Sequence, residues 1–413
     1  MTADSKNLMV VSESSSGVVM GGSDAGVFNA IKAATEVLSG INVIKRTDFL
    51  TRIANIPTQQ FVDDLESYLG LHTVQQILRS MGLISARSWS EVKALVSGGV
   101  RSKPELKIKL ADAVVMQQAC DLKAVAYNVI KPSDVASVEA AIKSISVPPT
   151  SMANAYPLRL SVEQLLQDDG ELKPIYTFDD EFGCGVVLGR KRVFTISEDI
   201  SYDKFDDSLR QQFPNAEKIV AVSSISRQTF DVLYLNKSSM LLEMRADVMR
   251  DATLMQTSKQ IEKSNNDLRA FAIRLLSSKV QGLVIDSPIN MFPLTSKVYA
   301  DPSGTIKKLG FATDTDSVKR ETMKAGVDLR QELFHKNGAH AIDHKMRIFE
   351  IAIQWHGSEV VGGVAGSKPE IHIPGTYRDY VSLNPRTDYL VVKGVRTFAD
   401  ADFIVKKINS YRS

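Results

Sequence analysis

The sequence is poor in cysteine and contains no long hydrophobic segment. Only Cys120 and Cys184 occur among 413 residues, so disulfides cannot form the framework of a chain of this size. No apolar run approaches the roughly 20 residues that a bilayer span requires, and the run from Leu8 to Val11 is too short for a secretory signal. We therefore expect a protein of the cytoplasm with no membrane partner.

An excess of charge of one sign is also missing. Fifty basic residues face 48 acidic ones, a formal net charge of +2, which gives no support to a uniformly basic surface for nucleic acid or membranes. The balance is uneven along the chain, with +1 over residues 1–150, −4 over 151–245 and +5 over 246–413. Any basic surface is therefore expected in the C-terminal part.

What remains is an ordinary globular composition, with 44% hydrophobic and 24% charged residues. A chain of this length exceeds one hydrophobic core, and its periodicity predicts an α+β multi-domain fold. The expected order is a flexible N-terminal arm at 1–26, an all-α module at 27–147, a ββαβββ domain at 151–247, a long connecting helix at 248–280, and a mixed α/β domain at 281–413.

The helical module is predicted from apolar spacings of three and four between Val27 and Ile145. Within it, the alanines and β-branched residues from Leu106 to Ile130 suit a buried helix pair. The prolines Pro148 and Pro149 end this pattern and mark a boundary.

Beyond that boundary the period changes to two, which predicts a small antiparallel sheet. The sequence Gly189-Arg190-Lys191 reads as a hairpin turn between two of its strands. The ββαβββ order comes from strands expected at 184–188 and 192–196, a helix at 202–213 and strands at 218–225, 230–234 and 240–244, with a further strand expected at 175–178 before them.

The C-terminal part interleaves helical and strand-like patterns. The long helix over 245–278 shows an incomplete heptad repeat, which favours a connecting helix over a coiled coil. Helices are then expected at 317–334, 339–355 and 398–411, and strands at 359–364, 370–373 and 389–395.

Five of the six histidines fall between His335 and His372. His340 and His344 are spaced four residues apart, so one helical face could present both to a metal ion, with Asp343 as a further ligand. The glutamate of the familiar zinc helix is absent between them, and the same histidines also suit the edge of an apolar core. No phosphate-binding loop or nucleophile elbow is complete, so no cofactor is expected.

Basic side chains supply the second candidate site. Arg190, Lys191 and Arg192 would lie together at the expected hairpin turn, where they could reach a phosphate backbone. In the C-terminal region basic and aromatic residues are interspersed, a mixture that suits single-stranded nucleic acid. The candidates there are Lys319, Arg320, Lys345 and Arg378, although a solvated basic face is the ordinary alternative.

Together these features favour a non-enzymatic binding or assembly protein of bacterial or viral type. We expect a homo-oligomer that contacts RNA or DNA through its C-terminal region. The alternative is a metal-dependent hydrolase centred on the histidines from His335 to His372. Whether the chain is an enzyme is left open by the sequence.

Overall fold

The computed structural model describes residues 51, 53–83, 86–97, 105–249, 258–324, 326–342, 345–357, 360 and 367–412. The expected N-terminal arm at 1–26 lies outside these residues. None of the described helices is long and apolar enough to cross a bilayer.

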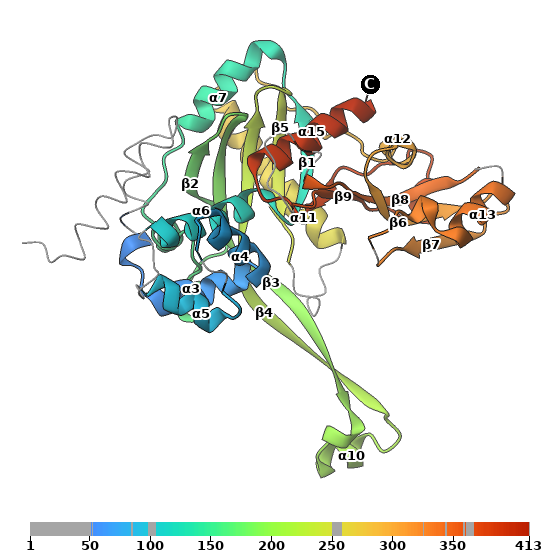
Figure 1. Ribbon diagram of the computed structural model, residues 1–413, viewed down its shortest axis with the longest axis horizontal. Helices are drawn as coiled ribbons and strands as arrows, with labels where there is room; N and C mark the ends of the chain where they lie inside the picture. The colour runs from blue at the N-terminus through green and yellow to red at the C-terminus, as the bar shows by residue number, and fades with distance from the viewer. Residues whose placement is uncertain are drawn as a thin grey trace, which may run out of the picture.

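One sheet of ten strands organises the fold, in the order β2-β3-β4-β5-β1-β10-β9-β8-β6-β7, and neighbouring strands pair antiparallel. Figure 1 shows the sheet extending across the molecule, with β2 toward one end and β7 at the other. The strands are β1 Lys123–Val129, β2 Lys173–Asp179, β3 Gly183–Ser201, β4 Lys218–Asn236, β5 Leu241–Asp247, β6 Thr305–Ala312, β7 Val318–Thr322, β8 Arg347–Gln354, β9 Glu370–Ile373 and β10 Leu390–Lys393.

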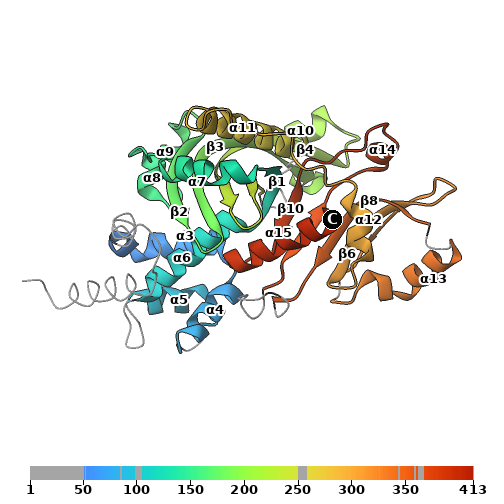
Figure 2. The ribbon, with the colours of Figure 1, turned by 90° about the horizontal axis from the view of Figure 1, so that it is seen from above.

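Helices cover both faces of this sheet. Helix α11 lies on one side and α6 and α15 lie on the other (Figure 2). The described helices are α3 Thr58–Tyr68, α4 Leu71–Ser80, α5 Trp89–Val96, α6 Glu105–Cys120, α7 Val135–Lys143, α8 Ser151–Ala155, α9 Val162–Leu166, α10 Asp207–Gln212, α11 Ser258–Ser277, α12 Leu294–Ala300, α13 Leu333–Ala341, α14 Tyr377–Tyr380 and α15 Phe398–Arg412, with single turns η1 Pro132–Asp134, η2 Tyr202–Lys204 and η3 Leu329–Gln331.

Two hydrophobic cores result, one on each face. Strand β1 contributes to both, because Ala124 and Ala126 point into the core with α7 and α11, whereas Val125 and Tyr127 point into the core with α6 and α15. A strand that is buried on both faces shows no polar alternation. This explains why Leu106 to Ile130 suggested helices throughout, when the helix ends at Cys120 and β1 follows.

The expected all-α module and small central sheet are therefore not confirmed. The first half of the chain supplies β1 to the middle of the sheet, and β1 pairs with β5 on one side and β10 on the other. The central and C-terminal regions share the same sheet. The fold is a mixture of helices and strands around one large antiparallel sheet.

Two predicted C-terminal helices are wrong in extent. The segment expected to be helical at 317–334 contains strand β7, and the segment at 339–355 contains strand β8. In β8 the β-branched residues Ile348, Ile351 and Ile353 are all buried, and a short apolar run of this kind does not distinguish strand from helix by its period. The strand at 370–373 and the terminal helix are confirmed.

We call the C-terminal end of the sheet, with β6 to β9, α12 and α13, the lobe. It stands beside the body in Figure 1. Tyr411 and Lys407 of α15 both bond Asp301, which follows α12, at 2.5 Å and 2.9 Å. Burial raises the pKa of Asp301, but these hydrogen bonds outweigh it and lower the pKa to about 2. The terminal helix thereby ties the lobe to the body.

Candidate interaction arm and its root

The most conspicuous feature of the molecule is a two-stranded arm formed by β3 and β4. The strands pair over their whole length, from Gly183 opposite Asn236 to Ser201 opposite Lys218. Strand β2 pairs with β3 only as far as Gly189, and β5 pairs with β4 only from Val232 onward. Beyond these points the ribbon leaves the sheet and carries η2 and α10 at its tip (Figure 1).

We define the arm as residues 193–225. The nine residues of β3 in this part extend for about 30 Å at the usual rise per residue. Both edges of the ribbon are without a strand partner in the described part of the chain.

Apolar side chains lie on both faces of the arm. One face exposes Val193, Val220 and Val222, and the Val222 side chain is 67% exposed. The opposite face carries four half-buried isoleucines. Two of them are on β3, Ile196 and Ile200, and two are on β4, Ile219 and Ile225. At the tip, Tyr202 and Phe213 are also exposed. The arm thus presents hydrophobic side chains on both faces and at its tip.

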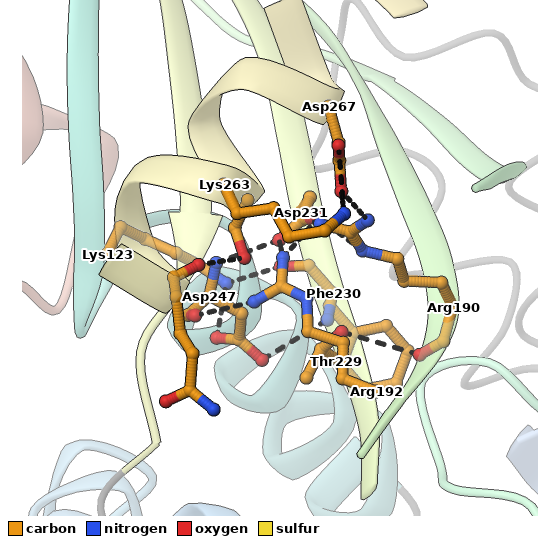
Figure 3. A network of polar contacts seen from close by, with 11 residues as sticks. Lys123, Arg190, Arg192, Thr229, Phe230, Asp231, Asp247, Lys263 and Asp267 are labelled. Atoms are coloured by element: carbon orange, nitrogen blue, oxygen red, sulfur yellow. Dashed lines mark hydrogen bonds and ion pairs between the residues drawn. The ribbon is translucent and has the colours of Figure 1, made fainter. Parts of the chain in front are cut away.

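A buried network of charges holds the arm where it leaves the sheet. Asp231 of β4 is fully buried and accepts two hydrogen bonds of 2.5 Å from Nη2 of Arg192 on β3. Nε of Arg190 lies 3.3 Å from the same carboxylate, and Nη1 of Arg190 contacts Asp267 of α11 at 2.9 Å. Figure 3 shows these side chains converging between the two strands and the helix.

The network continues into the centre of the sheet. Lys123 of β1 is fully buried and donates to Asp247 at 2.8 Å and to the Phe230 carbonyl at 2.5 Å. The Asp247 amide in turn donates to Asp231 at 2.8 Å. We call this set the root; it contains Lys123, Arg190, Arg192, Asp231, Asp247 and Asp267.

The root has three basic and three acidic members, so its formal charge is balanced. Burial raises the pKa of Asp267, but hydrogen bonds from Arg190 and Lys263 outweigh it and keep the pKa below its ordinary value. Because the members come from β1, β3, β4, β5 and α11, the network fixes the direction of the arm relative to the sheet and its covering helix.

The expected hairpin turn at Gly189-Arg190-Lys191 is wrong, since all three residues lie inside β3. A side chain at Gly189 would approach Met152 and Ile175 to about 3.0 Å and 3.2 Å, so the glycine permits close packing and makes no turn. Arg190 and Arg192 are nearly buried in the root, and Lys191 donates to the carbonyls of residues 166 and 168. Internal partners therefore occupy all three basic side chains.

The other predicted nucleic-acid residues lie in the C-terminal region. Lys319 and Arg320 are on β7, Arg378 is on α14, and Lys345 precedes β8; all four are exposed. Arg320 also contacts the buried Glu350 at 3.3 Å. Their role in nucleic-acid binding stays a prediction.

The histidines that suggested a metal site have separate environments. His340 lies in α13, which ends at Ala341, whereas Asp343 and His344 lie outside the described residues. No cluster of metal-ligating side chains occurs among the residues that the structure describes. The helix expected at 339–355 is wrong in extent, because α13 ends at Ala341 and β8 begins at Arg347.

His335 and His372 are engaged elsewhere in the lobe. The buried His335 joins Glu321 through Nδ1 at 2.5 Å and Tyr299 through Nε2 at 2.9 Å, which fastens α13 to β7 and α12. His372 bonds Glu350 at 3.0 Å. Burial raises the pKa of Glu350, but hydrogen bonds from His372 and Lys308 lower it to about 2.

Neither cysteine has the surroundings of a reactive thiol. Both are buried, and burial raises the pKa of Cys120 and of Cys184 to about 12. The two thiols therefore stay protonated at neutral pH.

Sequence reasoning located Arg190 and Arg192 of the root but assigned them to a surface, and it missed Lys123 and the arm. The available signal was the enrichment of β-branched residues in both 193–200 and 219–225, two segments of similar length on either side of a short acidic helix. The sequence matches no family model, and no curated protein matches it significantly.

Proposed function

We propose that this chain is a self-associating assembly protein and that its arm contacts a neighbouring copy. The single observation that carries the proposal is a ribbon, about 30 Å long, that leaves the sheet with exposed valines on one face and half-buried isoleucines on the other.

A two-stranded ribbon is only marginally stable by itself in water, because it lacks a second layer to bury its side chains. Its open edges and exposed valines also invite pairing with other chains. A partner that covers the arm would bury its exposed side chains and shield its open edges. A second copy of the chain is always present at the concentration of the protein itself.

The root supports the same proposal. Six charged side chains hold the arm in one direction relative to the sheet. A rigid projection loses little conformational freedom when it binds, so the interaction is stronger than that of a flexible loop with the same side chains.

The test is a chain with a shortened arm. Residues 197–222 are replaced by Asn-Gly, which joins the cross-strand partners Ile196 and Ser223 through a hairpin turn. Sedimentation velocity is expected to give a mass above 45.5 kDa for the natural chain and a monomer for the shortened one, with unchanged circular dichroism. A natural chain that stays monomeric up to high micromolar concentration would contradict the proposal.

Two point variants provide a matched comparison. Val222→Asp places a charge on the arm, and Leu383→Asp places one outside the arm, at a side chain after α14 that is 99% exposed. We expect Val222→Asp to weaken self-association and Leu383→Asp to leave it unchanged. Equal effects of both substitutions would show that the arm has no special part in assembly.

A further inference from the structure

The arm is acidic as well as apolar. Residues 193–225 contain six carboxylates and three basic side chains, a net charge of −3. Asp199 pairs with Lys218 at 2.8 Å, but Glu198, Asp207 and Glu217 are exposed and have no ion-pair partner among the described residues. The arm as a whole therefore carries excess negative charge, although the Arg210 guanidinium lies 5.2 Å from the centre of the exposed Tyr202 ring.

The lobe carries an exposed surface that is also apolar but is basic instead of acidic. Leu333 and Phe334, in the first turn of α13, are 71% and 74% exposed. Lys336 on the same helix, Lys319 on β7 and Lys324 just after β7 are exposed as well, and in the described part of the chain none of the three has an ion-pair partner.

These side chains belong to one region of the lobe. The hydrogen bond between His335 and Glu321 joins α13 to β7, and Figure 1 shows the two elements side by side. We call this region the lobe patch, defined by Lys319, Lys324, Leu333, Phe334 and Lys336. Strand β7 is also the last strand of the sheet, so its outer edge is without a strand partner among the described residues.

The arm and the lobe patch match in character but stand apart within one molecule, since the tip of the arm and the lobe point in different directions (Figure 1). We infer that the arm of one copy docks on the lobe patch of the next. This inference rests on the self-association proposed above and names the surface that receives the arm. Apolar contacts form the centre of the interface, and the carboxylates of the arm meet the lysines at its rim.

Such a contact joins two different surfaces, so it is head-to-tail. Each copy that accepts an arm still offers its own arm to a further copy. Contacts of this type close into rings when the rotation between copies permits it and otherwise form helical filaments.

Charge reversal tests the pairing. The arm variant Glu198→Lys/Asp207→Lys and the lobe variant Lys319→Glu/Lys336→Glu are each expected to weaken self-association at least about tenfold at low salt. The chain that carries all four substitutions is expected to regain most of it. Lys131→Glu, a reversal at an exposed site away from both surfaces, is the control.

Cross-linking gives a direct readout of proximity, because both natural cysteines are buried. Gln212→Cys lies at the end of α10, and Asn337→Cys lies on α13; both positions are exposed. An oxidised mixture of the two single variants is expected to give a disulfide-linked dimer with one chain of each type. Neither variant alone is expected to form a dimer in comparable yield.

The outcomes separate this inference from the broader proposal. A natural chain that is monomeric at every concentration overturns both. An oligomer that ignores the charge reversals and gives no mixed cross-link overturns the docking of arm on lobe and leaves self-association standing. Binding of a single-stranded RNA or DNA oligonucleotide that is lost in Lys319→Glu/Lys336→Glu, with the oligomer intact, assigns the lobe patch to nucleic acid and overturns the inference.

Discussion

Removal of the Asp231 carboxylate is expected to loosen the base of the arm. The side chain is fully buried, and it receives two 2.5 Å hydrogen bonds from Arg192 and lies 3.3 Å from Arg190. In Asp231→Asn the shape is kept, but two guanidinium groups that are nearly buried lose their shared counter-charge. Breaking a buried ion pair in this way costs about 3–5 kcal/mol.

Hydrogen exchange at the amides of residues 226–231 measures this loss locally. At tenfold per 1.4 kcal/mol, the expected acceleration is about 150-fold or more. The matched control is Asp199→Asn, which removes an exposed ion pair of the same two strands and is expected to cost less than about 1 kcal/mol. The reasoning is refuted if the two variants exchange equally fast.

A second variant separates the loss of charge balance from simple loss of packing. In Asp231→Leu/Arg192→Leu, both ends of the strongest pair become apolar. Replacement of a whole buried pair costs far less than removal of one partner, so exchange at the root is expected to be slower than in Asp231→Asn. Faster exchange would mean that the geometry of the hydrogen bonds, and not the charge balance, holds the root together.

Three other perturbations have defined outcomes. A Cβ atom at Gly183 would lie 1.9 Å from a backbone carbonyl oxygen of β4, so Gly183→Ala should lower the melting temperature of the protein. A Cβ atom at Gly338 in α13 would meet nothing within 4 Å, so Gly338→Ala should stabilise the helix by about 0.5–1 kcal/mol. Because Asp301 has a pKa lowered from 3.8 to about 2, its contribution to stability is complete above pH 4 and declines as the pH falls toward 2, so Asp301→Asn should flatten the acid side of a urea-midpoint profile. His335→Ala leaves Glu321 without its 2.5 Å partner and should cost about 1–3 kcal/mol in urea unfolding; a smaller loss would mean that water replaces the imidazole.

Local signals predicted some elements well. The terminal helix follows from its apolar spacing, and the strand at 370–373 follows from its alternation. Signals failed where burial on both faces erased the pattern, as in β1, where only Val129 at the end is exposed. They also failed at Gly189, because a glycine chosen for close packing and a glycine chosen for a turn are identical in the sequence.

The candidate site was less accessible to sequence reasoning than the fold. Arg190 and Arg192 were identified as unusual, but their partners Asp231 and Asp267 lie 39 to 77 residues away. From the sequence alone, a charged residue whose partner is distant along the chain cannot be distinguished from a charged residue that faces solvent. The pairing of β3 with β4, which aligns Leu188 with Asp231, brings Arg190 and Arg192 to Asp231, and the packing of α11 adds Asp267.

The position of β1 has a consequence for the synthesis of the chain. Its two neighbours in the sheet are β5 and β10, and the second of these, Leu390–Lys393, comes long after β1 has ended at Val129. At about 5–20 residues per second, one edge of β1 waits for about a quarter of a minute to a minute before its partner leaves the ribosome. The central strand is thus made long before its second partner, and that edge of the nascent chain stays open until β10 has emerged.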